Sequence, residues 1–202
     1  MAVFRRYLTE AEEKRFFATV DRPRDIWARR DCAVFRLLRT TGARVGSACG
    51  LTVGDAKTAL REPYHLHFVS SAAKGGRGYS IFATQATRRH LRALLAIRRE
   101  LGLAETADAP LLVSRQTAST GRGMTRRAVQ QRFEYWRAEA GMADVSPHWM
   151  RHTLAQRVMR NSTARDPRGV VQGMLGQSSI NSTAIYTKPS KEDLQAAFEE
   201  VA

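Results

Sequence analysis

The sequence predicts a mainly α-helical fold that contains one small antiparallel β-hairpin. Most segments place apolar residues three or four positions apart, the spacing of a helix with one buried face. One region instead alternates apolar and polar residues, as strands do, and a glycine-rich loop joins its two halves. The chain has 202 residues, enough for a domain with a sizeable core. No repeat or change of composition marks a boundary, so we expect a single domain over residues 1–202.

Three helices are expected in the N-terminal quarter. Residues 9–12 form a capping box, Thr-Glu-Ala-Glu, which opens the first helix. Residues 26–41 have the apolar spacing of a second helix, and Gly42 can adopt the left-handed turn that ends it. Arg44 is expected to open a short third helix. Taken alone, this arginine is interpreted as a surface charge at a helix start.

The predicted hairpin pairs residues 64–69 with residues 79–82. Lys74 and Arg77 lie in the loop between these strands, next to glycines. A solubilising charge is the simplest role for a loop lysine, so this loop alone does not indicate chemistry.

Two helices are expected between the hairpin and residue 140. The first begins at Thr84 and has a basic outer face that includes Arg98. The second begins at Thr125 and points an apolar stripe inward. Its opposite face carries Arg126, Arg127, Gln130 and Gln131. Arginine and glutamine can hold phosphates or read base edges, although a merely solvated face has the same pattern.

A helix start at Ser146-Pro147 places two further polar residues together. Serine is a good N-cap and proline suits the first helical position. His148 and Arg151 then share one face near a helix N-terminus, which favours an anion. A last helix is expected at about residues 190–201. Its single apolar stripe would dock on its own core or on a neighbouring subunit.

The charge of the chain favours a polyanionic partner. Its formal net charge is +14, from 33 Lys and Arg against 19 Asp and Glu. A basic surface binds nucleic acid because it releases condensed counterions. No dense basic block indicates an anionic membrane, and no signal peptide or membrane-length apolar run is present. No Cys/His cluster suggests a metal site. We therefore expect a cytoplasmic, nucleoid-associated protein that binds double-stranded DNA without a metal or other cofactor.

Four motifs, taken together, resemble those of the tyrosine site-specific recombinases, also known as the phage integrase family, in order and spacing. They are Thr41-Gly42-Ala43-Arg44, the loop lysine Lys74, His148-Trp149-Met150-Arg151, and Leu175-Gly176-Gln177 with Tyr186 nine residues after Gln177. The resemblance extends from about residue 9 to the end of the chain. It implies the fold of the catalytic domain of that family.

The resemblance also implies a catalytic set and a reaction. The set is Arg44, Lys74, His148, Arg151, Gln177 and Tyr186. The arginines would neutralise a DNA phosphate, the tyrosine would attack it, the histidine would act as base and the lysine would protonate the leaving 5′ oxygen. The helix from Thr125 would face DNA, and Arg77 is assigned to DNA binding with it. The product would be a 3′-phosphotyrosyl link that is rejoined without ATP or metal.

Three departures from the family pattern leave alternatives open. Gln177 replaces the usual histidine, and Ser47 replaces a common acidic residue. The sequence also begins at the catalytic domain, so we expect no N-terminal core-binding domain. A homo-oligomer on DNA is expected, with a tetramer as one form, and an accessory DNA-bending or core-binding protein is a further expected partner. The competing functions are a degenerate DNA-binding regulator and a type IB topoisomerase-like enzyme.

Overall fold

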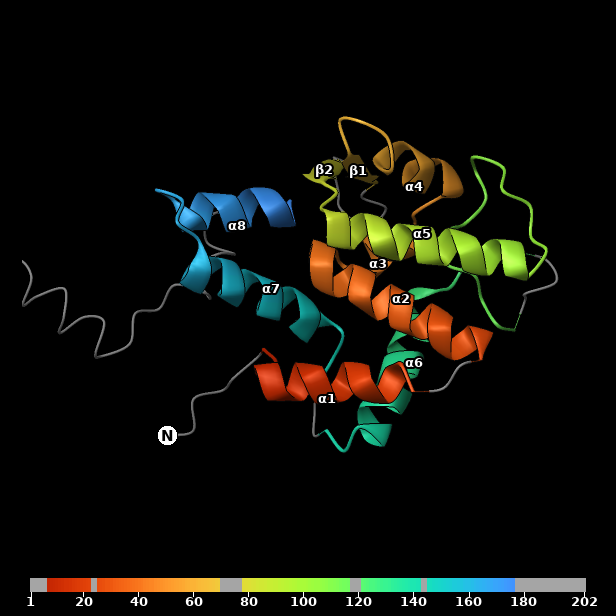
Figure 1. Ribbon diagram of the computed structural model, residues 1–202, viewed down its shortest axis with the longest axis horizontal. Coiled ribbons are helices and arrows are strands. Elements are labelled where there is room, and N and C mark those ends of the chain that lie inside the picture. Colours follow the sequence, from red (N-terminus) through yellow and green to blue (C-terminus); the bar gives the residue numbers. More distant parts are fainter. Residues whose placement is uncertain (1–6, 23–24, 70–77, 117–120, 143–144, 177–202) are drawn as a thin grey trace, which may run out of the picture.

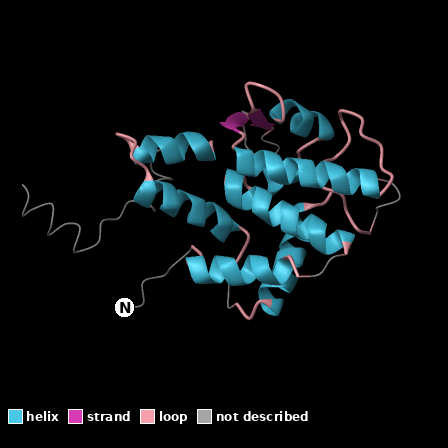
Figure 2. Ribbon diagram, viewed as in Figure 1, coloured by secondary structure: helices cyan, strands magenta, loops and turns pink. Residues whose placement is uncertain are grey.

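The computed structural model describes residues 7–22, 25–69, 78–116, 121–142 and 145–176. Within these residues it contains helices and one two-stranded antiparallel sheet, which confirms the predicted fold class (Figures 1 and 2). The elements are α1 (Glu10–Val20), α2 (Ile26–Thr41), α3 (Val45–Cys49), α4 (Val53–Ala59), β1 (His65–Phe68), β2 (Tyr79–Phe82), α5 (Gln85–Glu100), α6 (Arg126–Glu139), α7 (His148–Asn161) and α8 (Pro167–Leu175).

Helix α2 lies at the centre of the molecule and packs against α1, α5 and α7 (Figure 1). A cluster of phenylalanines fills the space between three helices. Phe16 of α1, Phe35 of α2 and Phe133 of α6 are fully buried, with ring centroids 5.0–5.6 Å apart. Aromatic pairs at this separation contribute beyond their buried area. The cluster therefore holds α6, the predicted DNA-facing helix, against the core.

The local signals for the first helices are confirmed. Thr9 forms the predicted capping box with Glu12, and α1 follows it. Asp25 accepts hydrogen bonds from two backbone N–H groups at the start of α2. Gly42 ends α2 in the left-handed conformation, with φ of 62°. Arg44 is the N-cap residue of α3, as expected.

The hairpin also forms at the predicted positions. Leu66 pairs with Ile81, and Phe68 pairs with Tyr79. Leu66 and Phe68 are buried and β1 packs against α4, so one face of the sheet closes the core. The sheet consequently fixes Tyr79, the first residue of β2, next to the core.

Two predictions about local structure are wrong. Arg98 was expected on the basic outer face of α5, but its side chain is buried and donates to the carbonyls of Pro110 and Ala104. These carbonyls come from a loop that the periodicity of α5 cannot show. The second error concerns α7, which begins at His148 rather than at Pro147 and has no side-chain cap from Ser146.

A buried charge network connects α2 to α6. The Asp31 carboxylate is fully buried and accepts hydrogen bonds from three side chains. Arg30 donates to it from the same helix, Arg132 Nε lies 2.6 Å away, and Trp136 Nε1 lies 2.8 Å away. A buried charge is tolerated only when it is paired and hydrogen-bonded. This carboxylate therefore determines how the side of α6 that faces the core is placed.

No helix in the described part of the chain has both the length and the apolar character needed to cross a membrane. The same residues contain no group of three or more His, Cys, Asp or Glu arranged to hold a metal ion.

Candidate functional site

Arg151 lies where three of the sequence motifs meet. Its side chain is only 2% exposed. Its Nη1 donates to the carbonyl oxygen of Gly42 at 2.7 Å, and its Nη2 donates to that of Leu175 at 3.0 Å. Because a guanidinium is planar, two bonds to different segments fix its orientation. The structure thus joins the Thr-Gly turn, the His-x-x-Arg helix and the Leu-Gly segment through one side chain.

Close packing of the Thr-Gly turn and the Leu-Gly segment makes this contact possible. A Cβ atom on Gly42 would lie 2.6 Å from Leu175 Cδ2, so only glycine allows this approach, and its φ of 62° also favours glycine. Leu175 itself is buried with Ala155 and Val171 in a small cluster between α7 and α8. Helix α8 is therefore held on α7 so that its last carbonyl reaches Arg151.

Arg44 and Arg151, the arginine pair, lie on the same side of the molecule, around the phenol of Tyr79. The positive charges of both arginines act on the Tyr79 hydroxyl, and Ser47, on α3, lies beside it. Arg44 is exposed, whereas the Tyr79 hydroxyl oxygen is inaccessible to solvent. The group formed by the arginine pair, Ser47 and Tyr79 therefore reaches the surface at Arg44.

The Tyr79 ring is held tightly between two elements. It stacks on Phe68 with a centroid separation of 5.0 Å and an interplanar angle of 22°. On another side it lies against Gly176, where a Cβ atom would come within 2.4 Å of the ring. Gly176 is the last residue that the structure describes in this segment. The hairpin and the C-terminal end of α8 therefore meet at this ring.

Burial raises the pKa of Tyr79 above its ordinary value, while the charges of Arg151 and Arg44 and the proximity of Ser47 act in the opposite direction. Arg151 and Ser47 are near enough to stabilise a phenolate. Nevertheless, the hydroxyl makes no hydrogen bond of normal geometry with the rest of the described chain. An unpaired buried hydroxyl costs about 1–3 kcal/mol.

His148 begins α7 and lies one turn before Arg151. It is exposed, and its ring packs edge-on against the buried ring of His152, with centroids 4.6 Å apart. The backbone N–H groups of Trp149 and Met150 donate to the carbonyls of Ser146 and Pro147 in a tight turn. These two amides are therefore not directed at an anion, and the positive charge near this helix start comes from arginine side chains.

The predicted DNA-facing surface of α6 is exposed. Arg126, Arg127, Gln130 and Gln131 all point to solvent, opposite the buried stripe of Val129, Phe133 and Trp136. Helix α3, which Arg44 caps, packs against α6. Arg44 of the arginine pair is thus attached to a helix, α3, that packs directly against α6.

Four of the predicted site residues lie outside the described residues: Lys74, Arg77, Gln177 and Tyr186. The predicted C-terminal helix at about residues 190–201 also lies outside them. Their places in the site remain predictions. The described chain ends at Gly176, directly before Gln177, and the carbonyl of the preceding Leu175 is bonded to Arg151. The last described residues, Leu175 and Gly176, thus lie beside Arg151 and Tyr79.

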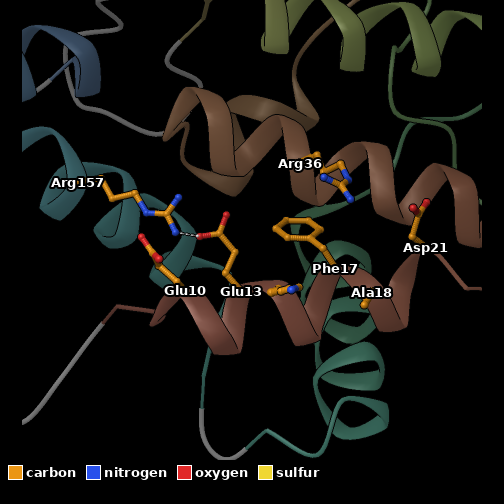
Figure 3. A pocket seen from close by; sticks show the side chains of 8 residues that line it. Glu10, Glu13, Phe17, Ala18, Asp21, Arg36 and Arg157 are labelled. Atoms are coloured by element: carbon orange, nitrogen blue, oxygen red, sulfur yellow. Dashed lines mark hydrogen bonds and ion pairs between the residues drawn. The ribbon is translucent and has the colours of Figure 1, made fainter. Parts of the chain in front are cut away.

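A separate groove of about 440 Å³ lies between α1, α2 and α7 (Figure 3). Glu13 lies within it and pairs with Arg157 at 2.6 Å and with Arg39 at 3.0 Å. The lining mixes acidic and basic side chains and includes none of the predicted site residues. We interpret Glu13 as a structural contact that joins α1 to α2 and α7.

Comparison with known proteins agrees with the motif pattern. The sequence matches the phage integrase family over residues 6–193. The chain belongs to this family. It is 31% identical to tyrosine recombinase XerC of Corynebacterium efficiens over 193 residues, which cover 96% of this chain and 57% of that protein. It is 35% identical to XerC of Mycobacterium bovis over 176 residues, with 87% and 55% coverage.

Solved structures share the fold of this phage integrase family member. The crystal structure of XerA recombinase superposes with a TM-score of 0.69 at 22% identity, covering 98% of this chain and 66% of XerA. XerH bound to its difH substrate superposes with a TM-score of 0.71 at 20% identity, covering 96% and 53%. These likenesses confirm the tyrosine recombinase catalytic-domain fold. The chain spans about half the length of the curated relatives it matches.

Sequence reasoning missed Tyr79, which was treated only as a strand residue. Its position directly after the glycine-rich loop is the one signal that could have drawn attention to it. Strand alternation does not show that its hydroxyl lies between Arg44, Arg151 and Ser47, because those residues belong to the segments of α3 and α7.

Proposed function

We propose that this chain breaks and rejoins double-stranded DNA as a site-specific tyrosine recombinase, through a 3′-phosphotyrosyl intermediate. The observation that carries the proposal is the placement of Arg44 and Arg151 around one point, from helices far apart in the sequence. A phosphodiester repels nucleophiles, so two fixed guanidinium groups on its non-bridging oxygens are the first requirement for catalysis.

The remaining roles follow from the chemistry of the side chains. A phenol has a pKa of about 10, so near neutral pH only about one in a thousand is ionised without help. We assign Tyr186 as nucleophile and His148 as its base, with the arginine charges favouring the phenolate. Lys74 protonates the leaving 5′ oxygen. Gln177 cannot transfer a proton, so its assigned role is to position the phosphate by hydrogen bonding.

The exposed face of α6 is the proposed DNA-contacting surface. Its four polar residues and the net charge of +14 favour contacts with phosphates and base edges. Arg77 is proposed to contribute from the hairpin loop. Two matched structures are of XerH bound to its DNA substrate, which supports DNA as the ligand of this chain. A DNA substrate places the proposed activity in the cytoplasm, at the nucleoid.

Assembly on DNA is the next part of the proposal. One matched structure is a lambda integrase dimer bound to a core site, which supports a homo-oligomer here, with a tetramer as the form that exchanges two duplexes. An accessory DNA-bending or core-binding protein is a further proposed partner. Integration, inversion and resolution all use the same strand chemistry, so the site geometry does not choose between them.

The comparisons do not favour the alternative functions. Both XerC relatives are recombinases. A degenerate DNA-binding protein would also have no need for the arginine pair, the histidine, the loop lysine and the tyrosine together.

A nicked suicide substrate tests the proposed activity. Fragments of the DNA that flanks the coding region supply candidate sites, and cleavage beside the nick lets the short strand diffuse away. We expect a covalent protein–DNA adduct in EDTA, together with a free 5′-hydroxyl that polynucleotide kinase can label. If the protein bound DNA but formed no adduct on any of the fragments, the result would contradict the proposal and favour the accessory function. Relaxation of arbitrary supercoiled plasmid would favour the topoisomerase.

Gln177→His should preserve or raise the rate of adduct formation. An imidazole can make the same hydrogen bond to phosphate and can also transfer a proton, a gain of up to about a hundredfold. Gln177→Ala is the matched control and should be slower than the wild type. Complete loss of the adduct in Gln177→His would show that this residue is wrongly placed in the site.

A further inference from the structure

The Tyr79 hydroxyl is a buried donor that the proposed catalytic set does not use. Its ring has packing partners on two sides, Phe68 and Gly176. Its oxygen makes no hydrogen bond of normal geometry with the described residues, although Arg151 and Ser47 are near enough to interact with it and Arg44 lies nearby. Packing alone would be served equally by phenylalanine, and the described residues do not supply a well-aligned acceptor for the hydroxyl.

The charges around this hydroxyl indicate the chemistry of that partner. Arg44 and Arg151 create a positive potential, and Arg44 opens the cluster to the surface. An anion bound at the exposed Arg44 would lie next to the side chains that cover the phenolic oxygen, and a local opening there would let it reach that oxygen. The raised pKa of Tyr79 keeps the phenol neutral near pH 7, and a neutral phenol donates a hydrogen bond. A phosphate oxygen accepts such a bond, and bonds to a charged acceptor are the stronger kind.

We propose that Tyr79 Oη donates a hydrogen bond to a non-bridging oxygen of the DNA phosphate held between Arg44 and Arg151. This inference rests on the proposed recombinase function and adds a phosphate-contacting residue to it.

Two other roles for Tyr79 fit the structure less well. A nucleophile needs a lowered pKa, whereas burial raises that of Tyr79. Its ring is also held between Phe68 and Gly176, which opposes a swing towards phosphorus. A purely structural tyrosine would make a hydrogen bond of normal geometry within the fold, and this hydroxyl makes none with the described residues.

Tyr79→Phe removes the hydroxyl but keeps the ring, so it tests the contribution of the hydroxyl alone. We expect the rate of adduct formation on the suicide substrate to fall by about 10- to 100-fold, the loss of one hydrogen bond to a charged group. The midpoint of thermal unfolding should stay the same or rise, because the variant no longer buries an unpaired hydroxyl. Tyr64→Phe is the matched control, since the Tyr64 hydroxyl contacts Glu62 at 3.4 Å in an exposed position. This control should retain the wild-type rate.

Methylphosphonate substrates then identify the contact. Each of the two diastereomers replaces one non-bridging oxygen at the cleaved phosphate with a methyl group. If the Tyr79 hydroxyl contacts one of these oxygens, the difference between wild type and Tyr79→Phe should disappear on one diastereomer and persist on the other. The same difference on both diastereomers would overturn the proposal, and so would a variant as fast as the wild type on the natural phosphate.

The failure of this inference is distinguishable from that of the proposed function. A wild-type adduct with no loss in Tyr79→Phe removes only the role of Tyr79. No wild-type adduct on any flanking fragment removes the recombinase activity, and the inference with it.

Discussion

Tyr186→Phe should abolish the covalent protein–DNA adduct, with a fall of about 1,000-fold or more in its rate of formation. The phenolic oxygen forms the bond to phosphorus, so without it no phosphotyrosyl link can exist, whatever the other residues contribute. DNA affinity should be unchanged, because phosphate binding depends on the arginines and on α6. Denaturing gels of the suicide-substrate reaction measure the adduct, and filter binding measures the affinity.

Tyr135→Phe is the control for this substitution. Tyr135 is 47% exposed on α6, where its ring contacts the Arg132 guanidinium, and its variant should form the adduct. Peptide mapping of the wild-type adduct should place the nucleotide on Tyr186. An adduct that persists in Tyr186→Phe would show that another tyrosine attacks. Among the tyrosines described near the arginine pair, Tyr79 would then be the first to test.

Asp31→Asn should destabilise the fold strongly. In the native pair the Arg30 side chain is 2% exposed and the Asp31 side chain 0%. The substitution leaves the positive charge of Arg30 buried without its partner. It also removes the carboxylate that accepts hydrogen bonds from Arg132 and Trp136. Breaking a buried ion pair from one side costs about 3–5 kcal/mol. For a chain of this size that corresponds to a fall of roughly 6–20 °C in the unfolding midpoint. Calorimetry or urea unfolding measures it.

Glu100→Gln provides a matched comparison. Glu100 pairs with Arg29, and the two side chains are 48% and 43% exposed. An exposed pair contributes about 0–1 kcal/mol, so this variant should unfold close to the wild type. If Asp31→Asn were no more destabilised than Glu100→Gln, the charge network would not be what holds α6 to α2.

Features that depend on nearby residues were predictable from the sequence. The capping box at Thr9, the glycine turn at Gly42 and the inward stripe of α6 all formed where the sequence indicated. Each involves hydrogen bonds or spacing within about four residues, so its outcome does not depend on the rest of the fold. The start of α7 is the exception, because Ser146 does not use its side chain as a cap.

The motifs also identified Arg44 and Arg151 as candidates, but motif spacing along the chain carries no information about where their side chains meet. That depends on the Leu175 side chain packing onto Gly42, and on the carbonyls of Gly42 and Leu175 accepting from one guanidinium. These contacts link residues that are far apart in the sequence, such as Arg151 and Gly42, which are 109 positions apart.

Buried polar groups were the features that local patterns could not predict. A charged residue is expected at the surface because burial costs free energy. Arg98 is nevertheless buried because the loop after α5 supplies carbonyl partners, and Asp31 because the distant helix α6 supplies side-chain partners. Tyr79 is the reverse case, a buried hydroxyl that makes no hydrogen bond of normal geometry with its described neighbours. Amino-acid type and spacing thus specified the helices, the hairpin and the family. The pairing of the buried polar groups depended instead on contacts between segments that only folding brings together. The same contacts placed the Tyr79 hydroxyl, which we propose binds a phosphate, near the arginine pair.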